Sequence, residues 1–175
     1  MAGDGRARPV TLTRAVLAFG GVLIGAAAWL AIDRRFRTTG LAAGLAAILL
    51  LLGGHRAHHG RGRYAERMLD TLLDRVWDGA VIGAIAWATR KDQPAVSAAA
   101  LGALGASFLS AYIRARGASL GYTVEESHVT RGVRYGLIAI GLVFARPLAP
   151  LWAAAVVSGL AALVRSGQVL KEERL

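Results

Sequence analysis

Three aspartates recur at every fourth position of the segment 68–79, at Asp70, Asp74 and Asp78. On an α-helix this spacing places them in one narrow acidic stripe. Each carboxylate in an apolar membrane segment costs about 2.5–3.5 kcal/mol, so something must compensate the charge. A divalent cation (Mg2+ or Mn2+ suits hard oxygen ligands), a buried arginine such as Arg75, or a water-filled cavity would do so. The plainer alternative is an acidic cap at a helix N-terminus, favoured by the helix dipole.

Three histidines precede the acidic stripe, at His55, His58 and His59. His55 and His59 have the i, i+4 spacing of one helix face, and with Asp70 and Asp74 they could complete a Mn2+ or Zn2+ ligand set. Four arginines in the same part of the chain disfavour a cation there. We therefore expect a cationic loop that contacts anionic lipid or phosphate.

Two pairs of arginines further along the chain could bind phosphate, namely Arg114, Arg116, Arg131 and Arg134. The guanidinium fork grips a phosphate group through two parallel hydrogen bonds. Anchoring of helix ends at the cytoplasmic face of a membrane explains the same arginines equally well. The residues alone leave both interpretations open.

The elements that must position these side chains are strongly apolar. The chain has 175 residues, of which 55% are hydrophobic and 18% charged, and its mean hydropathy is +0.46. A soluble domain of this size cannot bury so much apolar surface, which excludes a disordered tail or a DNA-binding module. The sequence contains no cysteine, which excludes disulfides, thiolate metal sites and cysteine nucleophiles.

Six apolar segments predict six membrane-spanning helices, with five as the alternative. The third segment spans only if its charged residues are tolerated at one end. The fifth spans only if Arg134 and Arg146 extend to the interface. We expect a basic N-terminus over 1–14, a membrane domain over 15–168 and a charged tail over 169–175. The predicted helices cover 15–32, 38–54, 69–89, 93–113, 129–145 and 147–164.

Basic residues and glycines give the predicted orientation and packing of these helices. With both termini cytoplasmic, most lysines and arginines fall on the inner segments, although Arg34, Arg35 and Arg37 do not. Arginines at the ends of apolar runs explain the net charge of +10 without nucleic acid. Close helix packing, or the general abundance of glycine in membrane helices, explains three G-x-x-x-G pairs, at Gly21/Gly25, Gly40/Gly44 and Gly79/Gly83.

The segment around the acidic stripe resembles the second half of the signature of CDP-alcohol phosphatidyltransferases, membrane enzymes that make phospholipid headgroups. The family pattern is D-x2-D-G-x2-A-R-x8-9-G-x3-D-x3-D, and Asp70 and Asp74 match its last two aspartates. The segment 111–116 resembles the basic end of the fourth helix in bacterial phosphatidylinositol-phosphate and phosphatidylglycerol-phosphate synthases. Arg131 and Arg134 resemble the arginine pair that opens the fifth helix of the inositol-phosphate type.

The first half of the signature is degenerate in this chain. Leu50 and Gly53 stand where the family has its first two aspartates, and Glu66 replaces the later glycine. The candidate remnants of the motif are Gly54, Ala57, His58 in place of the arginine, and the additional acid Asp78.

The resemblance implies an all-α, six-helix membrane bundle in the bacterial inner membrane, with both termini cytoplasmic. It implies that Asp70 and Asp74 hold Mg2+ or Mn2+, that Asp74 also acts as the base, and that the four arginines named above bind phosphate. The implied partners are membrane lipids, CDP-diacylglycerol, an acceptor alcohol, and a second copy or a related membrane protein.

Three functions are compatible with this sequence. The first is transfer of a phosphatidyl group from CDP-diacylglycerol to an alcohol with release of CMP. The second is a catalytically silent family member that serves as a partner subunit or lipid-binding protein, which the missing aspartates favour. The third is an unrelated small transporter or membrane scaffold, with the acidic stripe as an ion or proton site.

Overall fold

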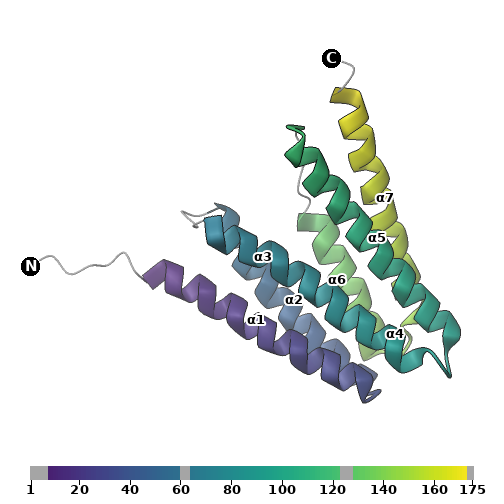
Figure 1. Ribbon diagram of the computed structural model, residues 1–175. Helices are drawn as coiled ribbons and strands as arrows, with labels where there is room; N and C mark the ends of the chain where they lie inside the picture. The colour runs from purple at the N-terminus through teal and green to yellow at the C-terminus, as the bar shows by residue number, and fades with distance from the viewer. Residues whose placement is uncertain (1–7, 60–63, 123–127, 173–175) are drawn as a thin grey trace, which may run out of the picture.

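The computed structural model describes residues 8–59, 64–122 and 128–172, with side chains over 13–55, 65–122 and 129–170. The described chain forms α1 (Arg8–Ile32), α2 (Phe36–His59), α3 (Tyr64–Trp77), the π-helical segment η1 (Asp78–Ile82), α4 (Gly83–Thr89), α5 (Pro94–Ser119), α6 (His128–Val143) and α7 (Leu148–Glu172). Because α3, η1 and α4 follow one another without a break, the described elements make six helical rods. The rods lie close together at the end that holds the α1–α2, α4–α5 and α6–α7 turns, and spread apart toward the other end (Figure 1).

Four helices are long and apolar enough to cross a membrane, over Thr13–Ile32, Phe36–His55, Pro94–Ser119 and Leu148–Leu170. The chain is therefore an all-helical membrane protein, and the predicted count of six spans is supported for four of them. The other two rods are the third, which carries the acidic stripe, and α6, which has 16 residues where a full span needs about 20. These two rods correspond to the third and fifth predicted segments, for which the sequence predicted a membrane span only under stated conditions.

Several helices extend further than the sequence indicated. The third rod begins at Tyr64 rather than at residue 69, and α2 continues to His59. The histidine segment predicted as a loop is thus the end of a helix. The final helix continues to Glu172, so most of the predicted charged tail is helical.

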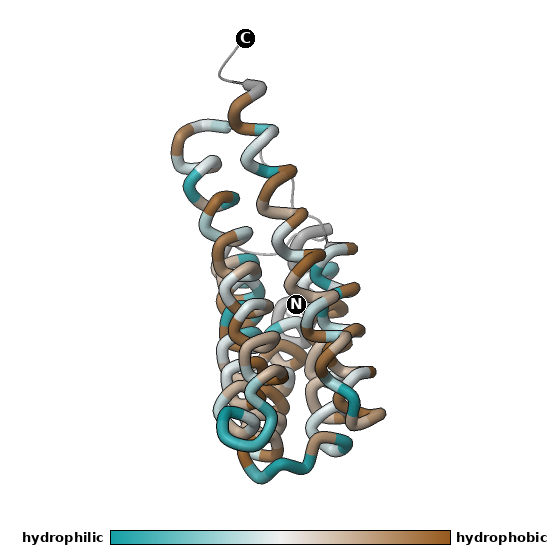
Figure 2. The backbone as a smooth tube through the Cα atoms, turned by 90° about the vertical axis from the view of Figure 1, so that its right-hand side faces the viewer, coloured by the Kyte–Doolittle hydropathy of each residue, from teal (hydrophilic) through white to brown (hydrophobic). Residues whose placement is uncertain are grey.

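Large apolar side chains cover the outside of the bundle, and small ones fill much of its interior. Figure 2 shows hydrophobic residues along the length of the helices and hydrophilic residues gathered at the turns. Exposed examples are Phe19, Trp29, Leu109 and Leu163, whereas many buried positions are alanines. Lipid tails would cover the first set, and alanines allow the helix backbones to approach closely.

Helices α2 and α6 approach each other closely at Gly40. A Cβ atom built on Gly40 would lie 2.7 Å from the carbonyl oxygen of Ala139 and from the backbone nitrogen of Val143. Gly40 therefore has the packing role that its G-x-x-x-G spacing predicted. Gly79 and Gly83 meet nothing within 4 Å, so that pair reflects the abundance of glycine.

The arginine cluster between α1 and α2 has local partners. Arg34, in the left-handed backbone conformation, forms an ion pair with Asp92 in the α4–α5 turn and donates to the carbonyl oxygen of Ala88 at 2.7 Å. Arg35 pairs with Asp33. These contacts connect the α1–α2 turn to the α4–α5 turn. They explain why arginines occur at the end of the bundle that the distribution of basic residues predicts to be non-cytoplasmic.

Candidate functional site

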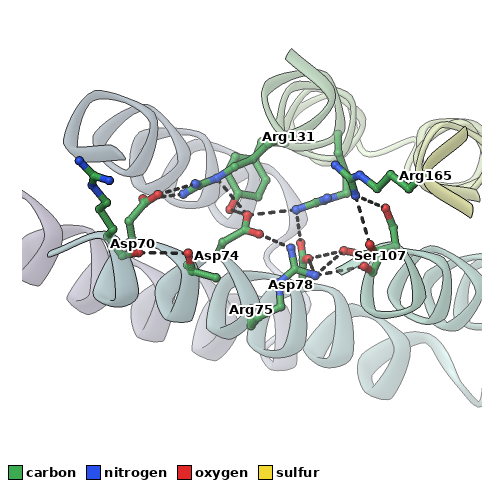
Figure 3. Close-up of polar contacts among 12 residues, drawn as sticks. Asp70, Asp74, Arg75, Asp78, Ser107, Arg131 and Arg165 are labelled. Carbon is green, nitrogen blue, oxygen red and sulfur yellow. Dashed lines mark hydrogen bonds and ion pairs between the residues drawn. The ribbon is translucent and has the colours of Figure 1, made fainter. Parts of the chain in front are cut away.

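The acidic stripe of α3 and η1 is buried and faces α6. Leu69 and Leu73 pack against the apolar core, and this orientation of the helix turns Asp70, Asp74 and Asp78 toward the arginines of α6. Asp70 and Asp78 are fully buried and Asp74 is 6% exposed. Figure 3 shows the three carboxylates in a row, with Arg131 reaching Asp70 and Asp74 from above. The alternative of a solvated acidic cap is therefore wrong.

Arg131 joins the first two carboxylates. Its Nη1 and Nη2 atoms each donate to one oxygen of Asp70 at 2.9 Å, the bidentate geometry of a strong arginine–carboxylate pair. Its Nε atom lies 3.0 Å from Oδ1 of Asp74. Both oxygens of Asp70 are thus engaged by one guanidinium group.

Two further arginines extend this chain of ion pairs. Nη2 of Arg134 lies 3.1 Å from Oδ1 of Asp74 and 3.1 Å from Oδ1 of Asp78. Arg75, one of the three compensating groups considered from the sequence, pairs with Asp74 and approaches Asp78 at 3.2 Å. Tyr135 donates to Asp74, and Ser107 of α5 donates to Asp78. We call this set of three aspartates and three arginines the charge ladder.

A polar pocket opens beside the charge ladder, between α3, α5, α6 and α7. The described residues that line it are Asp74, Arg75, Ser107, Ser110, Ala111, Arg114, Thr130, Arg131, Arg134, Ser158 and Arg165. Asp74 is the acidic member of this lining, whereas Asp70 and Asp78 do not take part in it. Five guanidinium groups and several hydroxyls around one carboxylate make a site suited to an anionic ligand such as phosphate.

Part of this pocket was not predicted from the sequence. Arg165 of α7 donates to the carbonyl oxygen of Ser110 at 3.2 Å and to its hydroxyl. Figure 3 shows Arg165 reaching in from the side opposite α3. The hydroxyl of Ser158 is buried and has no hydrogen-bond partner. Arg165 was visible in the sequence only as a basic residue near a helix end, and the serines carried no signal beyond lying on apolar helices.

The predicted phosphate-binding arginines divide into two groups. Arg114, Arg131 and Arg134 line the pocket, whereas the exposed Arg116 does not. The motif remnant Gly54 contacts the site directly, because a Cβ atom built there would lie 2.8 Å from both carboxylate oxygens of Asp70. The side chains of Ala57, His58 and His59 lie outside the described residues, and His55 is exposed.

Around Asp70, the residues that the structure describes do not form a set of three metal ligands. Within the described residues, no group of three or more His, Asp or Glu side chains is arranged to hold a metal ion. Leu50 is fully buried and apolar, and the side chain of Leu17 lies 2.7 Å from where a Cβ of Gly53 would be. The predicted metal ligands Asp70 and Asp74 are held instead by guanidinium groups.

Comparison with known proteins gives close agreement over most of the chain. The phosphatidylinositol phosphate synthase of Corynebacterium glutamicum is 33% identical over 157 residues, which cover 83% of this chain and 71% of the relative. No family model matches the chain.

Three solved structures of the phosphatidylinositol phosphate synthase of Mycobacterium tuberculosis share the fold. The apo form has a TM-score of 0.73 at 24% identity and covers 89% of this chain and 87% of its own. The form with CDP-DAG bound has a TM-score of 0.75 at 22% identity and covers 93% of each chain. The form with manganese and citrate has a TM-score of 0.74 at 21% identity, covering 93% of this chain and 88% of its own, and is consistent with a divalent metal in proteins of this fold.

These matches agree with the part-signature at Asp70 and Asp74 and with the helical architecture. They also exclude the hypothesis of an unrelated transporter or scaffold. The chain therefore belongs to the CDP-alcohol phosphatidyltransferase family, together with the phosphatidylinositol phosphate synthases.

Proposed function

We propose that this protein transfers a phosphatidyl group from CDP-diacylglycerol to an alcohol that itself carries a phosphate, with release of CMP. The observation that carries the proposal is the pocket itself, in which several arginines surround the carboxylate of Asp74. The relative's name, phosphatidylinositol phosphate synthase, and the neighbour with CDP-DAG bound support the same substrate class.

The residues of the pocket suggest a division of labour. Arg114 and Arg165 would bind the phosphate of the acceptor alcohol, because they line the pocket and are not part of the charge ladder. Arg134 would bind the diphosphate of the lipid substrate while holding Asp74 in place. Arg116 is not assigned a role in the pocket, and its exposed position fits contact with lipid headgroups.

The proposed step is a displacement at phosphorus. The hydroxyl oxygen of the acceptor forms a bond to the phosphorus of the phosphatidyl group, and the bond from that phosphorus to the oxygen of CMP breaks. Asp74 accepts the proton of the hydroxyl, and CMP leaves with the bonding electron pair. The arginines orient both phosphates and stabilise the charge that develops on their oxygens.

Release of CMP is the direct test. Purified protein in lipid nanodiscs is supplied with CDP-diacylglycerol and a panel of alcohols that includes inositol phosphate and glycerol phosphate. We expect release with one acceptor, loss of turnover in Asp74→Asn, and no change in the matched control Arg116→Ala. Absence of release with every acceptor, while the Corynebacterium glutamicum relative is active under the same conditions, would overturn the proposal.

A second candidate is a catalytically silent family member that binds lipid or serves as a partner subunit. Leu50 and Gly53 favour it, since the signature has aspartates at these two positions. This candidate predicts that CDP-diacylglycerol binds without turnover and that the protein co-purifies with an intact relative. Binding assays run beside the CMP assay separate the two functions.

We further propose a location in the bacterial inner membrane with six spans, both termini cytoplasmic, and a homodimer or a complex with a related membrane protein. The membrane domain over 15–168 is the proposed functional unit. The arrangement of the rods supports this, because α1 begins and α7 ends at the same, wider end of the bundle (Figure 1). Labelling of cysteines introduced near each terminus, in intact and in permeabilised cells, tests the orientation.

A further inference from the structure

The charge ladder balances itself without any added ion. Three aspartates alternate in space with three arginines, and each arginine bridges two carboxylates. Buried carboxylates need a compensating cation. In this chain guanidinium groups supply it, so the ladder presents no excess negative charge that would attract a divalent ion.

Among the described residues, the groups that touch the Asp70 carboxylate leave little room for a metal ion and do not complete a set of three ligands. Arg131 occupies both carboxylate oxygens, and the backbone of Gly54 lies against their other side. Leu17 fills the volume beside Gly53, and Leu50 is fully buried. A Mg2+ or Mn2+ ion needs about six oxygen ligands, and the side chains of Arg131, Leu17 and Leu50 provide none.

We infer that Arg131 occupies the position of a cation at Asp70, and that the pocket binds the phosphates of its lipid substrate without a divalent metal. The identity of the substrate rests on the function proposed above, whereas the replacement of metal by guanidinium rests on the contacts of Asp70. Asp70 is then a positioning residue that holds Arg131 at the pocket wall.

The pocket has enough positive charge and enough hydrogen-bond donors for this role. The ladder is neutral as a set, and Arg114 and Arg165 add two positive charges to the lining. Ser158 contributes a buried hydroxyl that has no partner within the described structure. A phosphate group that enters the pocket can therefore be bound through arginines and a serine hydroxyl alone.

The first arm of the test measures binding of Mn2+ alone. The protein is freed of metal with EDTA and titrated with Mn2+ while electron paramagnetic resonance records the free ion, with the Mycobacterium tuberculosis synthase as a positive control. We expect no stoichiometric site that depends on the ladder. Stoichiometric binding that is lost in Asp70→Asn or in Asp74→Asn would overturn the inference. Binding that persists in both variants lies elsewhere and agrees with it.

The second arm measures binding of CDP-diacylglycerol to the protein in nanodiscs, in EDTA and in Mn2+. We expect affinities that agree within about threefold. Binding that requires Mn2+ would overturn the inference. If CDP-diacylglycerol binds under neither condition, the proposed substrate is wrong, and the Mn2+ titration still decides whether Asp70 holds a metal. The two failures are therefore distinguishable.

Discussion

Asp70 and Asp74 lie one helical turn apart on the same face of the same helix, yet they occupy different environments. Asp70 is enclosed between Arg131 and the backbone of Gly54 and does not reach the pocket. Asp74 lies on the pocket wall, where Arg75, Arg131 and Arg134 approach it from two helices. The two aspartates match consecutive positions of one signature, so residue type and spacing alone do not assign their roles.

The difference comes from α2, which covers the Asp70 end of the ladder and not the other. Two positions of α2 that carry carboxylates in the family signature are Leu50 and Gly53 here. With these residues the Asp70 end is closed against α1 and α2, while the Asp74 end opens toward α5 and α7. This contrast supports the proposed positioning role of Asp70 and the proposed chemical role of Asp74.

The largest effect should come from removing the guanidinium that closes the Asp70 end. Arg131→Ala leaves a fully buried carboxylate without its bidentate partner, which should destabilise the fold by about 3–5 kcal/mol. Unfolding in mixed detergent micelles measures the loss. The double variant Arg131→Met with Asp70→Leu should recover most of the stability, because it removes the buried charge together with its partner. Failure of the double variant to recover would show that Arg131 acts through other contacts.

A smaller loss should follow from adding one carbon atom at Gly54. The new Cβ of Gly54→Ala would press on both oxygens of Asp70, and such overpacking costs about 1–3 kcal/mol. Gly25→Ala is the matched control, since nothing lies within 4 Å of its added Cβ, and it should be neutral. Equal stability of the two variants would contradict a closed Asp70 end.

The pocket end should respond in ligand binding rather than in stability. Arg165→Ala removes a charged donor from the lining and should raise the KM for the phosphorylated acceptor by about 10- to 100-fold. Arg116→Ala, at an exposed arginine outside the lining, should leave KM unchanged. A matching rise in both variants would indicate a general effect of surface charge, which added salt would abolish.

The smallest effect should come from an ion pair far from the ladder. Arg34 and Asp92 pair across two exposed turns, and such pairs contribute about 0.2–1 kcal/mol. Asp92→Asn should therefore change the free energy of unfolding by less than any variant of the ladder. A loss as large as that of Arg131→Ala would remove the contrast between buried and exposed pairs.

The sequence predicted the helical membrane fold, the acidic stripe and three of the pocket arginines, because helical spacing and arginine chemistry are local properties. It did not predict that Arg131 faces Asp70, since the two are 61 positions apart. It predicted phosphate binding for both Arg114 and Arg116, because the sequence does not show in which direction each of two residues at one helix end faces. Arg165 and Ser158 became part of the site through the packing of α7 on α5, which no short pattern encodes.

The charge ladder also affects how the chain enters a membrane. The third rod and α6 are the two rods that do not reach the length and composition of a span by themselves. One carries the aspartates and the other carries two of their arginine partners. A ribosome completes the acidic helix well before α6 emerges, and hydrocarbon strongly disfavours unpaired carboxylates. With six spans, as proposed above, we expect stable insertion of the acidic helix to await the synthesis of α6, so that aspartates and arginines enter the bilayer core together.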